Sequence, residues 1–345
     1  MTSSKFGLVL GILLTAAVAY MQQVADPSFD TRVAQPAYTK THPKILFDEA
    51  HNNFHTSTGR YKPFADLITN DGYSITPGRE KFSRKTLEGF DVLIIVNALG
   101  AERQNLPEAS RPAFTETECD AVRDWVKSGG SLLLIADHAP FGAAAEIMAQ
   151  RFNVEMSKGH TSDPDNHDSE TGNMSFLAFT RANNLLLGHA ITDGRGQTER
   201  INKVISFTGQ SLKGPAGSVP FLRLSDSALD LNRQAREAAA DTKPIDRLPD
   251  GRPLPPGVTA RASSGAGVPR TSAAGRAQAL AFEFGKGRVV VLGEAAMLSA
   301  QVVKGPAAQL MGREEFQMGM NRPGIDNRQL GLNIMHWLSR LLASR

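Results

Sequence analysis

Acidic side chains and histidines follow directly on three apolar runs of this sequence. In chain order they are Asp48 and His51 after 44–47, Asp137 and His138 after 131–136, and Glu294 after 288–293. A continuous apolar run of this length is typical of a buried parallel strand, and ligands bind at the carboxyl ends of such strands. We therefore expect these side chains to converge on one edge of a sheet.

Carboxylates and imidazoles that converge in this way could hold a divalent metal ion or transfer protons. For a metal site the expected ligands are Asp48, His51 and His138, and zinc is the ion expected with imidazole ligands. For acid–base chemistry the expected catalytic groups are Asp137, His138 and Glu294, and Asp137 would orient an imidazole. The polar segment 160–168 could close over the same edge, although its spacing matches no standard zinc or calcium motif.

Each of these side chains also has a purely structural interpretation. Asp48 and Asp137 could accept hydrogen bonds from loop N–H groups at the strand ends. His51 and His138 could be fixed by the neighbouring carboxylates, and Glu294 could cap the segment 295–299. The sequence leaves both interpretations open.

Several function classes lack their signature. The sequence has no G-x-S-x-G nucleophile turn and no Walker phosphate loop, so we expect neither a serine hydrolase of that type nor a nucleotide cofactor. The formal charge is +3 and the pI is about 9.0, but Lys and Arg are interleaved with Asp and Glu. This distribution argues against a nucleic-acid partner.

The pattern of elements predicts an α/β fold with a doubly wound, mostly parallel sheet, because strands alternate with helices up to residue 152. Thr115 and Glu118 form a capping-box pattern that starts a helix, which ends at Gly129. Strands are expected near 203–208 and 219–224. Gly285-Lys286-Gly287 predicts a C-terminal hairpin, and Asp326 or Asn327 is expected to cap a last helix.

The motifs together resemble the class I glutamine amidotransferase-like superfamily, of flavodoxin-like architecture. The segments that carry the resemblance are Phe47–Asn52, Ala136–Phe141, Gly287–Glu294 and Asp326–Gln329 with the helix after it. They span about 44–343 apart from an insertion. More narrowly, the chain resembles exported bacterial domains of unknown function, related to auxiliary domains of gliding-motility and ABC-transport systems and to an intraflagellar-transport domain. The resemblance implies a fold and no particular activity.

One position departs from the true amidotransferases, which place a cysteine on a tight turn after a strand. The matching turn here is Ala136–Pro140, and the only cysteine, Cys119, lies in the predicted helix as a half-buried packing residue. We therefore do not expect glutamine amidotransferase chemistry.

The N-terminus predicts export. Lys5 precedes an apolar stretch from Phe6 to Met21, and Ala17-Val18-Ala19 has the pattern of a cleavage site. Residues 1–21 are expected to be a signal peptide or an uncleaved membrane anchor, 22–42 a spacer, and 43–343 one domain with an irregular insertion at about 233–276. The expected location is periplasmic or secreted, with membrane contact only through an uncleaved N-terminus.

Two functions remain open from the sequence. The first is an exported hydrolase, with or without a metal, that acts on a small-molecule or cell-envelope substrate. The second is a non-catalytic module that binds a ligand or partner at the same polar edge.

Overall fold

The structure, a computed structural model, describes residues 11–13, 22–231, 243–245, 253, 260–263, 269–305, 308 and 314–343. The predicted N-terminal leader lies outside these residues except for β1 (Gly11–Leu13), and the predicted insertion is described only in part. Two of its segments, β14 (Lys243–Ile245) and β15 (Ala260–Ser263), form an antiparallel sheet with β1. None of the helices in the described part has both the length and the apolar character of a membrane span.

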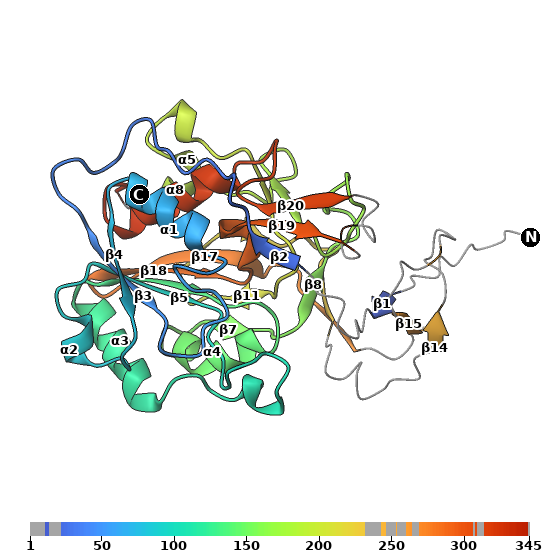
Figure 1. Ribbon diagram of the computed structural model, residues 1–345, viewed down its shortest axis with the longest axis horizontal. Coiled ribbons are helices and arrows are strands. Elements are labelled where there is room, and N and C mark those ends of the chain that lie inside the picture. The colour runs from blue at the N-terminus through green and yellow to red at the C-terminus, as the bar shows by residue number, and fades with distance from the viewer. Residues whose placement is uncertain are drawn as a thin grey trace, which may run out of the picture.

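A nine-stranded mixed sheet forms the centre of the protein (Figure 1). Five neighbouring strands are parallel, in the order β4 (Ser74–Gly78), β3 (Lys44–Asp48), β5 (Val92–Val96), β6 (Ser131–Ile135) and β18 (Gly287–Leu292). The antiparallel strands that follow are β17 (Ala277–Phe284), β11 (Leu212–Lys213) and β7 (Glu155–Met156), and β12 (Val219–Arg223) also pairs with β17. The predicted doubly wound α/β fold and the C-terminal hairpin β17–β18 are confirmed.

The strand order creates a topological switch point between β3 and β5. The chain passes from β3 outward to β4, then returns past β3 to β5 and continues to β6 and β18. In open sheets of this order, the loops that leave the two central strands diverge and form a crevice at the carboxyl ends. The loops after β3, β5, β6 and β18 therefore share one edge, which we call the carboxyl edge.

Helices cover both faces of the sheet because alternate strand residues point to opposite sides. Ile45 and Phe47 pack with α1 (Lys62–Asn70) and α8 (Asn327–Leu338) in one apolar cluster. Leu46 belongs to the other cluster, which also holds residues of α2 (Arg84–Leu87), α3 (Glu116–Ser128) and α4 (Phe141–Gln150). In Figure 1 the first pair of helices lies above the sheet and the other three below it.

The predicted start of α3 is confirmed and that of α8 needs a correction. Thr115 and Glu118 form a reciprocal capping box, and Gly129 ends α3 with a φ of 132°. Asp326 does stand at the N-cap of α8, but its side chain makes no cap hydrogen bond. Its Oδ2 instead accepts the amides of Asn202 and Lys203, at 2.7 and 3.0 Å. The Asp326 carboxylate therefore binds backbone amides distant in sequence and does not cap the helix as the local pattern predicted.

Short elements fill the remainder of the described chain. Residues 203–205 and 219–223 are strands, as predicted, and 203–205 is β10. The others are β2 (Gln22–Ala25), β8 (His160–Ser162), β9 (Ala178–Thr180), β13 (Leu229–Leu231), β16 (Arg270–Ser272), β19 (Ala300–Lys304), β20 (Glu315–Gly319), α5 (Ala190–Asp193), and the 3-10 turns η1 (Pro107–Ser110), η2 (Gln197–Glu199) and η3 (Ala296–Leu298). They form small sheets beside the central one, in the orders β10-β9, β16-β13-β8 and β2-β19-β20.

Candidate functional site

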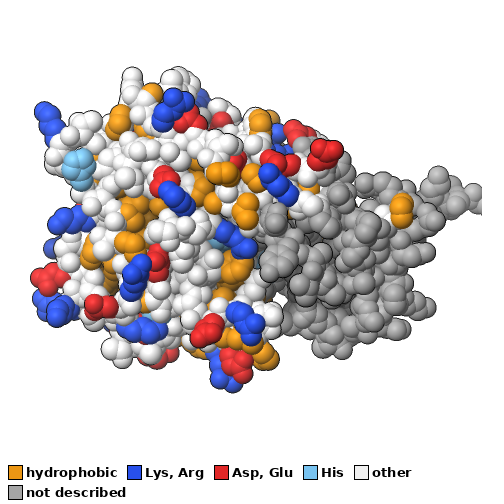
Figure 2. Space-filling model, in the orientation of Figure 1, with side chains coloured by type: hydrophobic (Ala, Val, Ile, Leu, Met, Phe, Trp, Pro, Cys, Tyr) orange, Lys and Arg blue, Asp and Glu red, His pale blue; other side chains and the backbone are white. Residues whose placement is uncertain are grey.

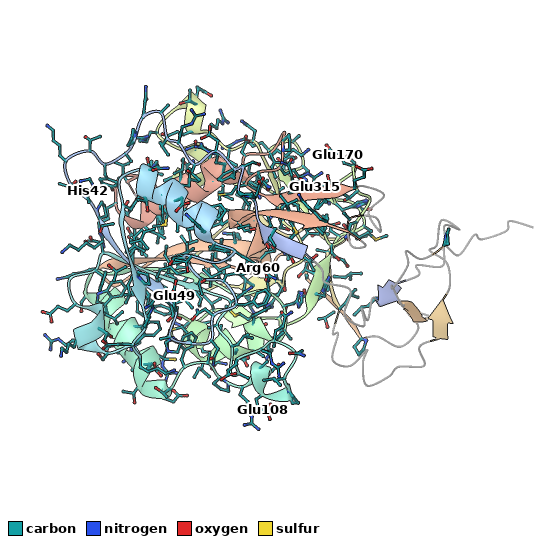
Figure 3. All side chains as sticks on the ribbon, in the orientation of Figure 1. His42, Glu49, Arg60, Glu108, Glu170 and Glu315 are labelled. Atoms are coloured by element: carbon teal, nitrogen blue, oxygen red, sulfur yellow. The ribbon has the colours of Figure 1, made fainter. Side chains whose placement is uncertain are left out.

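The candidate site lies at the carboxyl edge. β3 ends there at Asp48, and the residues that follow β5, β6 and β18 are Asn97, Asp137 and Glu294 within two positions of each strand end. Figure 3 labels Glu49 and Arg60 in the loop that leaves β3, and His42 at the opposite end of that strand. The parallel register of these strands places their ends at the same level of the sheet. The strand ends therefore lie at one edge, as predicted. The role of each side chain at this edge depends on its hydrogen-bond partners.

Asp48 and His51 belong to a closed buried cluster with Glu118. The His51 ring nitrogens Nδ1 and Nε2 lie 2.8 Å from Asp48 Oδ1 and 2.8 Å from Glu118 Oε1, respectively. Carboxylate oxygens accept hydrogen bonds, so the ring satisfies both contacts when each nitrogen carries a hydrogen. Asn53 also donates to the second Asp48 oxygen at 3.0 Å.

Aromatic rings and the start of α3 hold this cluster in place. Phe82 and Phe114 each lie 4.6 Å from the His51 ring, measured between ring centroids. Burial acts to raise the pKa of Glu118, but hydrogen bonds from His51 and Thr115 outweigh it and lower that pKa to about 2. The contact between His51 and Glu118 thus joins the loop after β3 to the first turn of α3.

Asp137 is held by two partners from neighbouring strand ends. Its Oδ2 accepts the side-chain amide of Asn97 at 2.7 Å, and its Oδ1 accepts the backbone N–H of Ala295 at 2.8 Å. Asn97 adopts the left-handed region, with φ at 46°, and its own Oδ1 accepts the Asp137 N–H at 3.0 Å. The sequence suggested an imidazole as the partner of Asp137, whereas these hydrogen bonds join the ends of β5, β6 and β18.

Glu294 caps the turn that follows β18, one of the two roles that the sequence left open. Its two oxygens accept the amides of Ala296 and Met297 at 2.6 and 2.8 Å. Burial, followed by the negative charge of Asp137, raises the pKa of Glu294 well above its usual range. Burial also raises the pKa of Asp137. The charge of Asp137 therefore disfavours the ionisation of Glu294.

His138 is half-buried and pairs with His160 of β8. The two ring centroids lie 4.8 Å apart at an interplanar angle of 31°. His138 Nδ1 is 2.8 Å from the carbonyl oxygen of Ala139, which only accepts, so Nδ1 carries a hydrogen and Nε2 of the neutral ring is an acceptor. The polar segment that begins at His160 does reach the carboxyl edge, as the sequence suggested.

The predicted metal ligands do not form one coordination sphere. Within the described residues, no group of three or more His, Cys, Asp or Glu side chains is placed to hold a metal ion. Both nitrogens of His51 face carboxylates, and His138 pairs with His160 rather than with Asp48. Metal binding thus remains a prediction from residue types alone.

Sequence reasoning missed several side chains at this edge. Tyr61 donates its hydroxyl hydrogen to the Ala295 carbonyl at 2.5 Å, and its pKa is raised far above normal by burial, then by Glu294 and Asp137. His55 is buried between the rings of Phe54 and Tyr61, and burial together with the charge of Arg60 lowers its pKa to about 3. No sequence motif marks either residue, and the partner of the Tyr61 hydroxyl follows a distant strand.

Cys119 is more deeply enclosed than we expected. It lies on the inner face of α3 with no exposed surface, and burial raises its pKa to about 12. It is a packing residue on α3 and does not lie on the turn after β6. A buried thiol with a raised pKa is a poor nucleophile, which is consistent with the prediction from the sequence.

No protein-family model and no curated protein matches this sequence. Among solved structures, the chain is similar to the mmIFT52 N-terminal domain, with 12% identity, a TM-score of 0.52, and coverage of 86% of this chain and 97% of that one. It also matches a putative GMP synthase subunit from Thermoplasma acidophilum (9% identity, TM-score 0.40, coverage 88% and 97%) and a putative ThuA-like protein from Bacteroides uniformis (12%, 0.36, 91% and 95%). The likeness to the mmIFT52 domain concerns the fold alone and carries no function.

Proposed function

We propose that this protein is a binding module of the cell envelope, and that its ligand or partner docks at the carboxyl edge beside Asp137 and His138. The observation that supports this most directly is the internal hydrogen bonding of the acids at that edge. His51 uses both ring nitrogens, and both Glu294 oxygens accept backbone amides. A general base needs a free lone pair within reach of substrate. Both ring nitrogens of His51 face carboxylates, and Glu294 is only 1% exposed, so neither side chain meets that need.

The chemistry that remains at the edge is suited to recognition. Asp137 and His138 are only half-buried, and each can present an acceptor: a carboxylate oxygen and the Nε2 of the neutral ring. Two adjacent acceptors on rigid strand ends favour a ligand rich in donors. The hydroxyl groups of a saccharide or the N–H groups of a peptide have that character.

The surface around the central domain agrees with a small, local binding site. Figure 2 shows basic and acidic side chains interspersed over one face, without a broad field of one sign. Placement in the cell envelope rests on the apolar N-terminal stretch Phe6–Met21 and its small-residue pattern at 17–19.

An array of soluble cell-wall saccharides and peptides tests the proposal. The wild-type protein should retain some fragments without altering their mass, and His138→Ala should weaken retention at least about tenfold, since it removes one acceptor. His42→Ala is the matched control, because this exposed histidine precedes β3 at the other end of the strand. Retention that is equal in both variants, or an array on which nothing binds, would overturn the proposal.

A hydrolase is the second candidate, and one observation favours it. The pKa values of Asp137 and Glu294 are both raised at the carboxyl edge, and paired acids with perturbed pKa values are frequent in active sites. In this version Asp137 or Glu294 holds the proton delivered to a leaving group, and His138 accepts one from water. A divalent metal, zinc first, remains the expected cofactor of the metal-assisted form.

The same array separates the candidates. Fragments cleaved by the wild type but not by Asp137→Asn, with both proteins unfolding at the same temperature, would establish the hydrolase in place of the binding module. Elemental analysis of protein purified without a metal-affinity tag decides the metal. About one zinc per chain that is lost in His138→Ala supports the metal-assisted form, and its absence at saturating zinc removes it.

A further inference from the structure

A second candidate site lies at the opposite edge of the sheet, where the parallel strands begin. A cavity of about 380 Å³ is lined there by residues from five separate segments. They are Phe152 and Asn153, His189, the loop 215–217 with Val219, Ala281–Phe284, and Trp337. The lining thus includes aromatic, small apolar and polar side chains. Cavities of this size that combine such groups are typical of small-molecule sites.

The cavity exists because β17 extends beyond its neighbour. β12 pairs with β17 from Arg223 to Val219, opposite Ala277 to Ala281, and Phe282 to Phe284 continue past it. This extension brings together the two apolar clusters that cover the central sheet, because Trp337 belongs to the cluster on one face and Phe152 to the cluster on the other. The side chains that line the cavity are therefore fixed by packing on both faces of the sheet.

Trp337 provides the polar observation that points to a ligand. The residue is 1% exposed, and its indole N–H has no hydrogen-bond partner among the residues that the structure describes. A buried donor without an acceptor destabilises the folded protein by about 1–3 kcal/mol. Such a donor therefore suggests that an acceptor from a ligand binds there. The ring itself is firmly placed, since the Arg288 guanidinium lies 5.0 Å from its centroid on one side and the His189 ring lies 5.2 Å away, edge to face.

His189 also lines the cavity, and its ring is held in place. Its Nδ1 accepts the N–H of Ile191 at 3.1 Å, which caps α5. The cavity thus combines aromatic side chains with the indole N–H of Trp337.

We propose that this cavity binds a small planar apolar molecule that carries a hydrogen-bond acceptor, such as a ring nitrogen or a carbonyl oxygen. The aromatic walls stack against the flat body of the ligand, and its acceptor meets the Trp337 N–H. The site is separate from the carboxyl edge, and it does not depend on the function proposed there.

The chain allows a direct test, because it contains only two tryptophans. Trp125→Phe leaves Trp337 as the single indole, so fluorescence and the indole N–H resonance then report on this cavity alone. The probe is isoquinoline, a flat bicycle with one ring-nitrogen acceptor. We expect saturable quenching and a downfield shift of the Trp337 N–H proton. Naphthalene, which has the same shape without an acceptor, should bind at least about tenfold more weakly.

A blocking variant and a matched control complete the test. Ala216 is exposed and lines the cavity, so Ala216→Phe should fill its mouth and weaken isoquinoline binding at least about tenfold without unfolding the protein. Ala274→Phe makes the same change at an exposed alanine outside the lining and should leave binding unchanged. The proposal is overturned if quenching is linear in isoquinoline, if Ala216→Phe binds like the control, or if naphthalene binds equally well.

Discussion

The imidazole of His51 lies 2.8 Å from the Glu118 carboxylate, across 67 residues of sequence. The contact joins the loop after β3 to the N-terminal turn of α3, and both side chains are buried. Glu118 therefore has two structural roles. It completes the capping box of its own helix, and it accepts a hydrogen bond from His51 of another element. His51, which the sequence suggested as a metal ligand, thus makes a contact that joins two elements of the fold.

Replacement of Glu118 by Gln should destabilise the protein by about 2–4 kcal/mol. The amide keeps the shape and some capping ability but removes the charge opposite His51, and a buried charge that loses its partner is costly. Unfolding in urea measures the change. Glu116→Gln is the control, since its exposed carboxylate on the same helix pairs with Arg151 at the surface. A cost below about 0.5 kcal/mol would show that the contact is not formed.

His55 should make stability fall as the pH falls below its ordinary pKa. Its folded-state pKa of about 3 is below the usual 6.5, so between these values the unfolded chain takes up a proton that the native protein refuses. The contribution is complete above pH 6.5 and is lost progressively toward pH 3. Each bound proton corresponds to about 1.4 kcal/mol per pH unit.

The test compares unfolding free energies between pH 5.5 and 4. His55→Phe keeps the packing against Phe54 and Tyr61 and should reduce the slope by about 1 kcal/mol per pH unit. His42→Phe is the matched control, because it makes the same change at an exposed histidine. If His55→Phe has the wild-type slope, His55 is already protonated in the native state.

Gly209 should not tolerate a side chain. A Cβ at this position would lie 2.3 Å from the Gly293 carbonyl oxygen and 2.7 Å from the Glu294 Cβ. The backbone after β18 would have to move, so Gly209→Ala should cost about 1–3 kcal/mol. Gly196→Ala is the control, because a Cβ there meets nothing within 4 Å. Equal melting temperatures for the two variants would contradict the close approach.

Cys119 should be unreactive in the native protein. Burial raises its pKa to about 12, so almost no thiolate is present at pH 8, and the side chain has no exposed surface. A chromogenic disulfide reagent should label it at least about a hundredfold more slowly than in protein unfolded by urea. Rapid labelling of the folded protein would mean that α3 opens readily from the sheet.

The sequence predicted the architecture because it follows from local patterns. Five-residue apolar strands, the Thr115–Glu118 capping box and the Gly-Lys-Gly turn each have a short-range physical cause, and the structure contains all of them. Element boundaries differ by a few residues, as with the strand expected near 203–208 and found at Lys203–Ile205.

The sequence also determined which residue types stand at the strand ends, since a parallel register brings Asp48, Asp137 and Glu294 to one edge. Asp48 and Glu294 bond groups close to them in sequence. Only the tertiary structure decided the partners of Asp137 and His51, because Asn97 and Ala295 reach Asp137, and Glu118 reaches His51, from distant parts of the chain. A buried polar group bonds whichever partner the packed backbone places beside it, so no local pattern could predict these contacts.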